Sequence, residues 1–218
     1  EYGRGADGTS AYMYFGRNAG HGHLDRLNIG MFGFGFDLSP ELGYPEFATA
    51  WPHRNEWSIT TISKNTVVVD EASQRTNWGG EPVFFKSLPG FQAVEVSSPN
   101  VYPQTSEYRR MLAFVETRPG LGYAVDVFRV AGGRDHRRSF HGASDQVGVQ
   151  GLALRRQPAG TLAGPDVPFG PHPEGAGFPV GYSWLKDIER SGPPRNDWQA
   201  EWSLAKGVNG ATGEEGGW

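Results

Sequence analysis

The sequence predicts an all-β fold, a layered antiparallel β-sandwich. There are 32 glycines and 16 prolines among 218 residues, and both residue types disfavour the interiors of helices. No long stretch places apolar residues at the i, i+3, i+4 and i+7 spacing of an amphipathic helix. Short apolar or alternating segments separated by turn residues are common instead, and this pattern is typical of antiparallel sheets.

Four segments in the first half of the chain are expected to be strands. Residues 11–15 are apolar and aromatic, and residues 27–36 are apolar with interspersed glycines. Residues 65–70 have a β-branched centre, which favours extended backbone, and residues 91–96 alternate polar and apolar side chains. Such alternation places one face of a strand on a core and the other toward solvent.

A hairpin is predicted from residues 108–115 and 123–130, which flank the turn-forming segment 118–122. Residues 140–142 and 147–154 are expected to continue the sheet. We expect the apolar strand positions to be largely buried, and these are Val67, Val69, Val94, Val96, Phe114, Val125 and Val127.

One antiparallel β-domain is expected over residues 1–156. Residues 157–197 are rich in proline and glycine, and we interpret them as an irregular excursion or a linker with an apolar island at 182–185. A further strand is expected near the start of the last segment, 198–218. Because the chain begins with Glu1 rather than Met, we interpret it as a piece of a longer protein, so a missing signal peptide says nothing about localisation.

Composition narrows the classes of function. Hydrophobic residues make up 37% of the chain, which is enough to build a core. The net charge is −4 and no long basic run occurs, which disfavours nucleic-acid binding. No apolar run approaches the ~18 residues of a membrane span. Because the chain has no cysteine, no disulfide framework is possible.

The most informative segment runs from Gly20 to Ile29 and contains two of the six histidines, one residue apart. On an extended strand, His21 and His23 would project from the same face, with Asp25 next along it. Two imidazoles beside a carboxylate are the raw material of a metal site or of acid–base chemistry. The alternative is a pair of ordinary polar strand residues.

Two further segments extend this pattern. Residues 38–45 form a turn that contains a carboxylate, and residues 57–70 are a polar run that leads into a strand. Together the three segments resemble the heparinase II/III-like family of polysaccharide lyases. That family's pattern runs Gly-His-x-His-x-Asp-x-Leu-Asn, then Asp-x-Gly-Tyr-Pro, then His-Asn-Thr-Val-Val-Val-Asp. The resemblance covers roughly the first 140 residues and is strongest from Gly20 to Asp70.

The resemblance implies a fold and an activity. Such enzymes carry an N-terminal α/α toroid before a C-terminal domain of layered antiparallel sheets, and the present chain resembles the second part alone. They cleave uronic-acid polysaccharides by β-elimination in the cleft between the two parts. An acidic polysaccharide substrate, a toroid elsewhere in the same chain and a periplasmic or secreted location are therefore expected, and the 218-residue piece alone is expected to be inactive.

The resemblance also implies roles for four residues. His21 matches the histidine that the β-domain contributes to catalysis, and His23 matches a ligand of a structural metal, usually zinc. Glu41 stands where the family has an aspartate ligand, and Lys64 stands where it has a third ligand, a histidine. A protonated lysine cannot coordinate zinc. Either the site is empty, or the Lys64 ammonium replaces the charge of the metal by pairing with Glu41, and both are favoured over an intact zinc site. Because a buried carboxylate needs a positive partner, we expect no stoichiometric zinc and a Lys64 ammonium near Glu41.

Other candidate residues follow from the chemistry of an acidic polymer. Elimination removes a weakly acidic proton beside a carboxylate, so a positive group and a base are needed near the substrate. His53, Arg54 and Asn55 are candidate substrate-binding residues, and the alternative for them is a solvated loop. A carbohydrate-binding or structural β-module without turnover remains the alternative function. A zinc hydrolase would need three protein ligands and an open position, and Lys64 argues against one.

Overall fold

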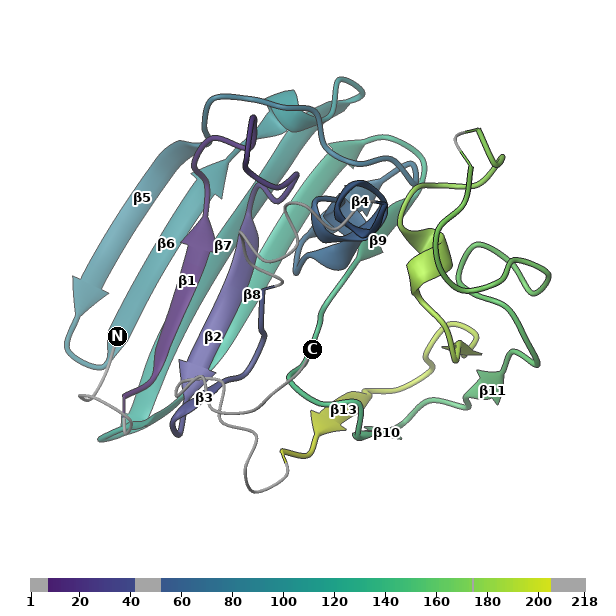
Figure 1. Cartoon of the computed structure of the whole chain (residues 1–218). Coiled ribbons are helices and arrows are strands. Elements are labelled where there is room, and N and C mark those ends of the chain that lie inside the picture. Colours follow the sequence, from purple (N-terminus) through teal and green to yellow (C-terminus); the bar gives the residue numbers. More distant parts are fainter. Residues whose placement is uncertain (1–7, 42–51, 174, 205–218) are drawn as a thin grey trace.

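The computed structural model describes residues 8–41, 52–173 and 175–204, which fold into antiparallel β-sheets connected by turns and short helices (Figure 1). The all-β antiparallel prediction is therefore confirmed. The largest sheet has four strands in the order β5-β6-β7-β8. Their bounds are Glu81–Leu88, Phe91–Ser97, Thr105–Arg118 and Leu121–Gly132.

A smaller sheet of three strands, β1-β2-β3, lies over one face of the large sheet (Figure 1). Its strands are Ser10–Tyr14, Asn28–Gly33 and Phe36–Asp37. The main core forms where the two sheets meet, since apolar side chains of both contribute to one buried cluster. That cluster includes Met13, Leu27, Ile29, Val96, Tyr108 and Leu112.

The predicted hairpin is confirmed as β7 and β8, which pair in antiparallel register. Arg118 pairs with Leu121, so the reversal is made by Pro119 and Gly120 alone. Gly120 has φ +75°, which favours glycine because a side chain would be strained there. Both strands are longer than predicted, because their polar ends still find backbone partners.

The burial prediction for the strand positions is only partly correct. Val125 is 39% exposed and lies on the face of the large sheet that points away from the small sheet. Because side chains alternate along β8, Val125 points to the face opposite the core. On that face the sheet forms an apolar hollow of about 600 Å³, which Val125 helps to line. Val67, Val69 and Val96 are buried, whereas Val94, Phe114 and Val127 are partly buried.

A short ribbon of two strands joins the motif-bearing segments to the rest of the fold. β4 (Val67–Val69) is fully buried and pairs with β9 (His136–Arg138). The π-helical turn η2 (Arg54–Ser58) and the 3-10 turn η3 (Thr61–Ser63) precede β4, and η4 (Pro99–Val101) precedes β7. The predicted strand at 140–142 is wrong, because the chain leaves the sheet after β9.

β5 was not predicted from the sequence. All eight of its residues are exposed, so the alternation that marks a half-buried strand is absent. The strand exists because its backbone pairs with β6 over residues 81–88. A long-range pairing of this kind leaves no signature in local hydrophobicity.

The C-terminal part adds two ribbons of two strands each. β10 (Val147–Gln150) pairs with β13 (Gln199–Trp202), so residues 147–154 do not continue the large sheet as predicted. β13 is the further strand expected after residue 197, and residues 205–218 lie outside the described residues. β11 (Arg155–Arg156) pairs with β12 (Glu189–Arg190).

The segment between these strands packs back on the β-domain. Its 3-10 turn η5 (Tyr182–Trp184) contributes Tyr182 to a second buried cluster with Ile62 and Val68. Gly181 precedes the turn with φ +92°, and a Cβ there would lie 2.5 Å from the Ile62 side chain. The close approach therefore needs glycine at position 181.

In the part of the chain that the structure describes, no helix is both long and apolar enough to cross a bilayer.

Candidate functional site

The segment with two histidines is a loop between β1 and β2, and the strand predicted there is wrong. The backbone turns at Gly22, whose N–H donates to the Ala19 carbonyl at 3.3 Å, and Leu27 has φ +60°. His21 is exposed, whereas the His23 side chain is only 10% exposed. The turn removes the two-residue periodicity on which a shared face depends.

Hydrogen bonds join this loop to the segment after η2. The Leu24 N–H donates to the Ile59 carbonyl at 2.9 Å, and the Thr61 hydroxyl donates to the Leu24 carbonyl at 2.7 Å. The first and third sequence motifs therefore lie against each other, although they are separated by more than thirty residues in the chain.

A buried arginine from the large sheet fixes both motifs. Arg110 on β7 is fully buried and donates two hydrogen bonds to Asp126, at 2.8 and 2.7 Å. Its remaining terminal nitrogen donates to the carbonyls of Leu27 and Asn65, each at 2.5 Å. Because guanidinium donors form a rigid fork, this contact sets the spacing between the two loops.

The Lys64 cluster, defined here as His23, Glu41 and Lys64, lies at the junction of these loops. Lys64 Nζ forms an ion pair with Glu41 Oε1, as the sequence predicted, and lies 2.8 Å from His23 Nδ1. The Lys64 side chain has no exposed surface, and the Glu41 side chain is 26% exposed. The remaining part of the second motif, residues 42–45, lies outside the described residues.

Two asparagines hold the cluster against the backbone. Asn28 Nδ2 donates to Glu41 Oε2 at 3.2 Å, and Asn28 Oδ1 accepts the backbone N–H of Asn65 at 2.8 Å. The Asn65 side chain in turn donates to the Ile29 carbonyl at 3.1 Å. Both carboxylate oxygens of Glu41 therefore have a partner, as a largely buried acid requires.

Burial and pairing act in opposite directions on the two charges. Burial lowers the pKa of Lys64 below that of a free lysine, while the adjacent Glu41 carboxylate opposes the shift. For Glu41, burial alone would raise the pKa, but hydrogen bonds from His23 and Lys64 outweigh it and lower the pKa. The carboxylate of Glu41 is therefore ionised at neutral pH.

His23 Nδ1 has two possible hydrogen-bond partners in the cluster, and each needs a different tautomer. His23 Nδ1 lies 2.9 Å from Glu41 Oε1 and 2.8 Å from Lys64 Nζ. A nitrogen that accepts a proton from the Lys64 ammonium cannot at the same time donate one to Glu41. Nδ1 therefore donates to Glu41 when it carries the ring proton and accepts from Lys64 when it does not.

Two further ionisable groups lie near the cluster. Asp25 is buried, and burial raises its pKa to about 6, although the Lys64 charge opposes the rise. Tyr12 on β1 is half-exposed, and burial together with the Glu41 charge raises its pKa to about 12. The Tyr12 phenol is therefore protonated at neutral pH.

The residues of the cluster do not fit the structural zinc that the family resemblance implies. Lys64 Nζ is within hydrogen-bonding distance of both His23 Nδ1 and Glu41 Oε1, and an ammonium nitrogen has no free lone pair for a metal. Among residues 8–41, 52–173 and 175–204, no group of three His, Cys, Asp or Glu side chains is arranged to hold a metal ion.

The candidate substrate-binding residues lie on or beside η2 rather than on an open loop. His53 precedes η2, and its ring contacts the Trp184 ring edge to face at 4.9 Å. Burial lowers the pKa of His53. Arg54 Nη1 donates to Asn55 Oδ1 at 3.2 Å, and both side chains are half-buried. The turn is linked to the His21 loop through Ile59.

Sequence reasoning missed the residues that position the site. Asn28 and Asn65 occur inside the quoted motifs, so the signal for them was present but was not interpreted. Arg110 lies on a predicted strand, next to Arg109, and nothing in a local pattern distinguishes the buried arginine from the half-buried one. Only the face of β7 on which each side chain lies separates the two.

Comparisons with known proteins agree with this architecture. A family model described as heparinase II/III-like, C-terminal, matches residues 9–166. A solved heparinase III with methylated lysines superposes with a TM-score of 0.55 at 18% identity, over 70% of this chain and 27% of that chain. At this identity the likeness shows the fold alone, and the present chain spans about a quarter of the solved structure. Curated protein sequences gave no match.

Proposed function

This chain belongs to the heparinase II/III-like C-terminal domain family, and we propose that it is the β-sheet domain of a polysaccharide lyase. The proposed substrate is a uronic-acid polysaccharide, and the proposed reaction is β-elimination. A helical toroid elsewhere in the same protein would complete the cleft. From the membership of this family, we propose a periplasmic or secreted location.

The observation that most supports this function is the contrast between the two histidines of one loop. His21 is exposed, while His23 is held in the Lys64 cluster two residues later. A side chain that must reach a polymer has to be exposed, and the backbone beside it has to be fixed. The buried cluster supplies that fixed support for His21.

The chemistry explains why a histidine is useful at this position. β-Elimination removes the C5 proton, breaks the C4–O bond and forms a C4=C5 double bond, and the departing oxygen takes up a proton. The electron pair left at C5 spreads onto the adjacent carboxylate, so that group must be neutralised. His21 is proposed either to hold the carboxylate or to accept the C5 proton.

Arg54 and Asn55 are proposed to contact the polymer from η2, with His53 positioning that turn. A guanidinium binds a carboxylate through two parallel hydrogen bonds, which fits a uronate. We propose that no zinc is bound and that the Lys64 ammonium supplies the positive charge beside Glu41.

The experiment is a turnover assay on the full-length protein, because the 218-residue piece is proposed to lack half of the cleft. His21→Ala should abolish or severely reduce the rise in ultraviolet absorbance that reports the unsaturated uronate product. His136→Ala, at an exposed histidine on β9, is the matched control and should keep normal turnover. Near-normal turnover by His21→Ala would remove His21 from the mechanism, and no product with any uronate polymer would favour a non-catalytic carbohydrate-binding module.

A further inference from the structure

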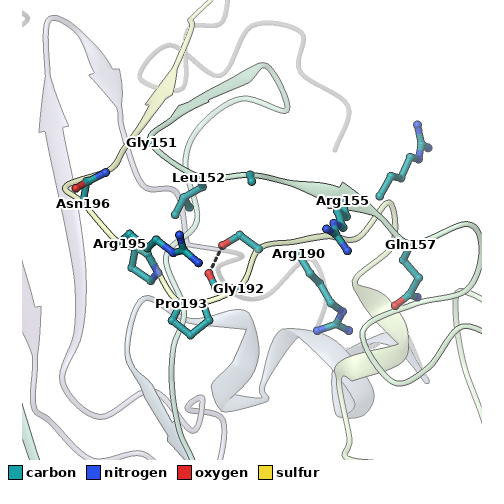
Figure 2. A pocket seen from close by; sticks show the side chains of 13 residues that line it. Gly151, Leu152, Arg155, Gln157, Arg190, Gly192, Pro193, Arg195 and Asn196 are labelled. Atoms are coloured by element: carbon teal, nitrogen blue, oxygen red, sulfur yellow. Dashed lines mark hydrogen bonds between the residues drawn. The ribbon is translucent and has the colours of Figure 1, made fainter.

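A second group of positive charges lies in the C-terminal part of the chain, away from the three motifs. A pocket of about 1190 Å³ is formed by two facing segments, residues 151–157 and residues 190–196. Figure 2 shows the two segments side by side, with Arg155 on one and Arg190 and Arg195 on the other. We call this site the arginine pocket. Its lining residues include no aspartate or glutamate.

The pairing of β11 with β12 places two like charges directly opposite each other. Arg155 pairs with Arg190 in the antiparallel register, so both side chains lie on one face of the ribbon. The next pair, Arg156 and Glu189, alternates to the other face of the ribbon, although Arg156 also contributes to the lining of the pocket. Like charges in directly opposite positions destabilise a pair of strands, so this arrangement is unfavourable without an anion between them.

The acidic residues of this region balance the positive charge of Arg156. Arg156 forms an ion pair with Asp187 at 2.8 Å, and Glu189 is its cross-strand neighbour. Within the described residues, Arg155, Arg190 and Arg195 form no ion pair, and all three are exposed. Three positive charges therefore face the pocket uncompensated, although the chain as a whole has a net charge of −4.

The backbone around the pocket is held in place before any ligand binds. The Gln157 N–H donates to the Ile188 carbonyl at 2.8 Å, and the Gln157 side chain donates to the Thr161 carbonyl at 2.9 Å. Pro193 and Pro194 stiffen the facing segment. A preformed site loses less conformational entropy when it binds.

We propose that the arginine pocket binds a segment of an acidic polysaccharide through its carboxylate or sulfate groups. Guanidinium groups bind such anions through paired hydrogen bonds, and the volume exceeds what one small molecule needs. The identity of the polymer rests on the proposed function. A single-stranded nucleic acid fits less well, because no aromatic residue lines the pocket for bases to stack on.

The pocket would hold the polymer at a position outside the His21 loop. Most of the residues that form it lie beyond residue 166, where the family match ends. A second contact of this kind raises the effective concentration of the same polymer at the cleft. It should therefore act on long chains and leave short oligosaccharides unaffected.

The test compares two triple variants of the full-length protein with the same change in net charge. The first is Arg155→Gln/Arg190→Gln/Arg195→Gln. The control is Arg75→Gln/Arg118→Gln/Arg134→Gln, at three exposed arginines outside the pocket. Equilibrium binding is measured with alginate, which has carboxylates only, and with dextran sulfate, which has sulfates only. Thermal unfolding monitors the fold of both variants.

The pocket variant should bind at least one of the two polymers at least tenfold more weakly, and the control should change binding less than twofold. The polymer affected identifies the anion. Turnover of a tetrasaccharide should be unchanged in the pocket variant, while the KM for long polymer rises. Equal losses in both variants, or no loss in the pocket variant, would overturn the proposal. Tighter binding of oligothymidylate than of either glycan at physiological salt would also overturn it.

The two proposals fail in different ways. If the full-length protein degrades no uronate polymer but the pocket variant still loses affinity, the lyase function is wrong and the binding site stands. If the protein degrades the polymer and the pocket variant binds it normally, the lyase function stands and the binding site is wrong.

Discussion

The Lys64 cluster and the arginine pocket differ in the burial and the ion pairing of their positive side chains. The Lys64 side chain is completely buried, and Glu41 and His23 contact its ammonium. The guanidinium groups of Arg155, Arg190 and Arg195 are exposed and form no ion pair within the described residues. A buried charge must be compensated inside the protein, because water cannot solvate it. An exposed charge needs no internal partner and is therefore available to a ligand.

The first prediction concerns the buried charge and has the largest expected effect. Lys64→Ala leaves the Glu41 carboxylate beside His23 without its ammonium partner, and it opens a cavity. We expect a loss of about 2–4 kcal/mol in the free energy of unfolding, below the full cost of breaking a buried pair because Glu41 is 26% exposed. Urea denaturation measures this, with the exposed Lys86→Ala as control. An effect as small as that of the control would mean that the cluster is not a structural element.

The second prediction tests whether His23 and Glu41 can bind a metal once the Lys64 ammonium is removed. Lys64→His removes the ammonium and provides a third nitrogen ligand beside His23 and Glu41. We expect this variant to bind one equivalent of zinc and to lose thermal stability on addition of a chelator. Metal analysis after mild purification should find no stoichiometric zinc in the wild type or in Lys64→Gln. Failure of Lys64→His to bind metal would show that His23 and Glu41 are not paired ligand positions.

The third prediction concerns the pH dependence of stability that the half-buried His141 causes. Burial lowers the pKa of His141, a hydrogen bond to the Ile62 carbonyl opposes the shift, and the Lys64 and Glu41 charges make smaller contributions of opposite sign. His141 Nε2 donates to the Ile62 carbonyl at 3.1 Å, and this hydrogen bond partly offsets the lowering of the pKa by burial. The Trp57 ring packs beside the imidazole.

The sign follows from proton binding in the two states. Below the ordinary histidine pKa, the unfolded chain binds a proton at position 141 that the folded chain does not. Stability should therefore fall as the pH drops through that value, by up to about 1.4 kcal/mol per pH unit, until the folded-state pKa is passed. Urea denaturation between pH 5 and 8 should show this slope reduced in His141→Asn and kept in His136→Asn. An equal slope in all three proteins would contradict the prediction.

The smallest expected effect is at the exposed charges. Arg155→Gln should change the free energy of unfolding by no more than about 0.5 kcal/mol, because the side chain is exposed. The change should be stabilising if it relieves the repulsion from Arg190 across the ribbon. The same urea denaturation measures it, and a loss comparable to that of Lys64→Ala would remove the contrast between the two regions.

Local patterns predicted the strands that are rich in β-branched residues or that alternate polar and apolar side chains. The valines of β4 and the alternation in β6 indicated extended backbone, and the proline and glycine of the 118–122 segment indicated the hairpin turn. These features succeed because backbone preference and one-sided burial act over a few neighbouring residues. β5 has no buried face, and the same reasoning therefore passed over it.

The antiparallel β class, the hairpin and the family motifs could be predicted from the sequence alone, and the pairing of Lys64 with Glu41 was one of the alternatives it offered. Long-range contacts cause the loop after Gly20 to turn, so that His21 is exposed while His23 joins a buried cluster. They also bring Arg155 opposite Arg190, which is 35 residues later in the chain. Motifs record which chemical groups are present, but their distances and burial depend on long-range backbone pairing, which no local pattern encodes.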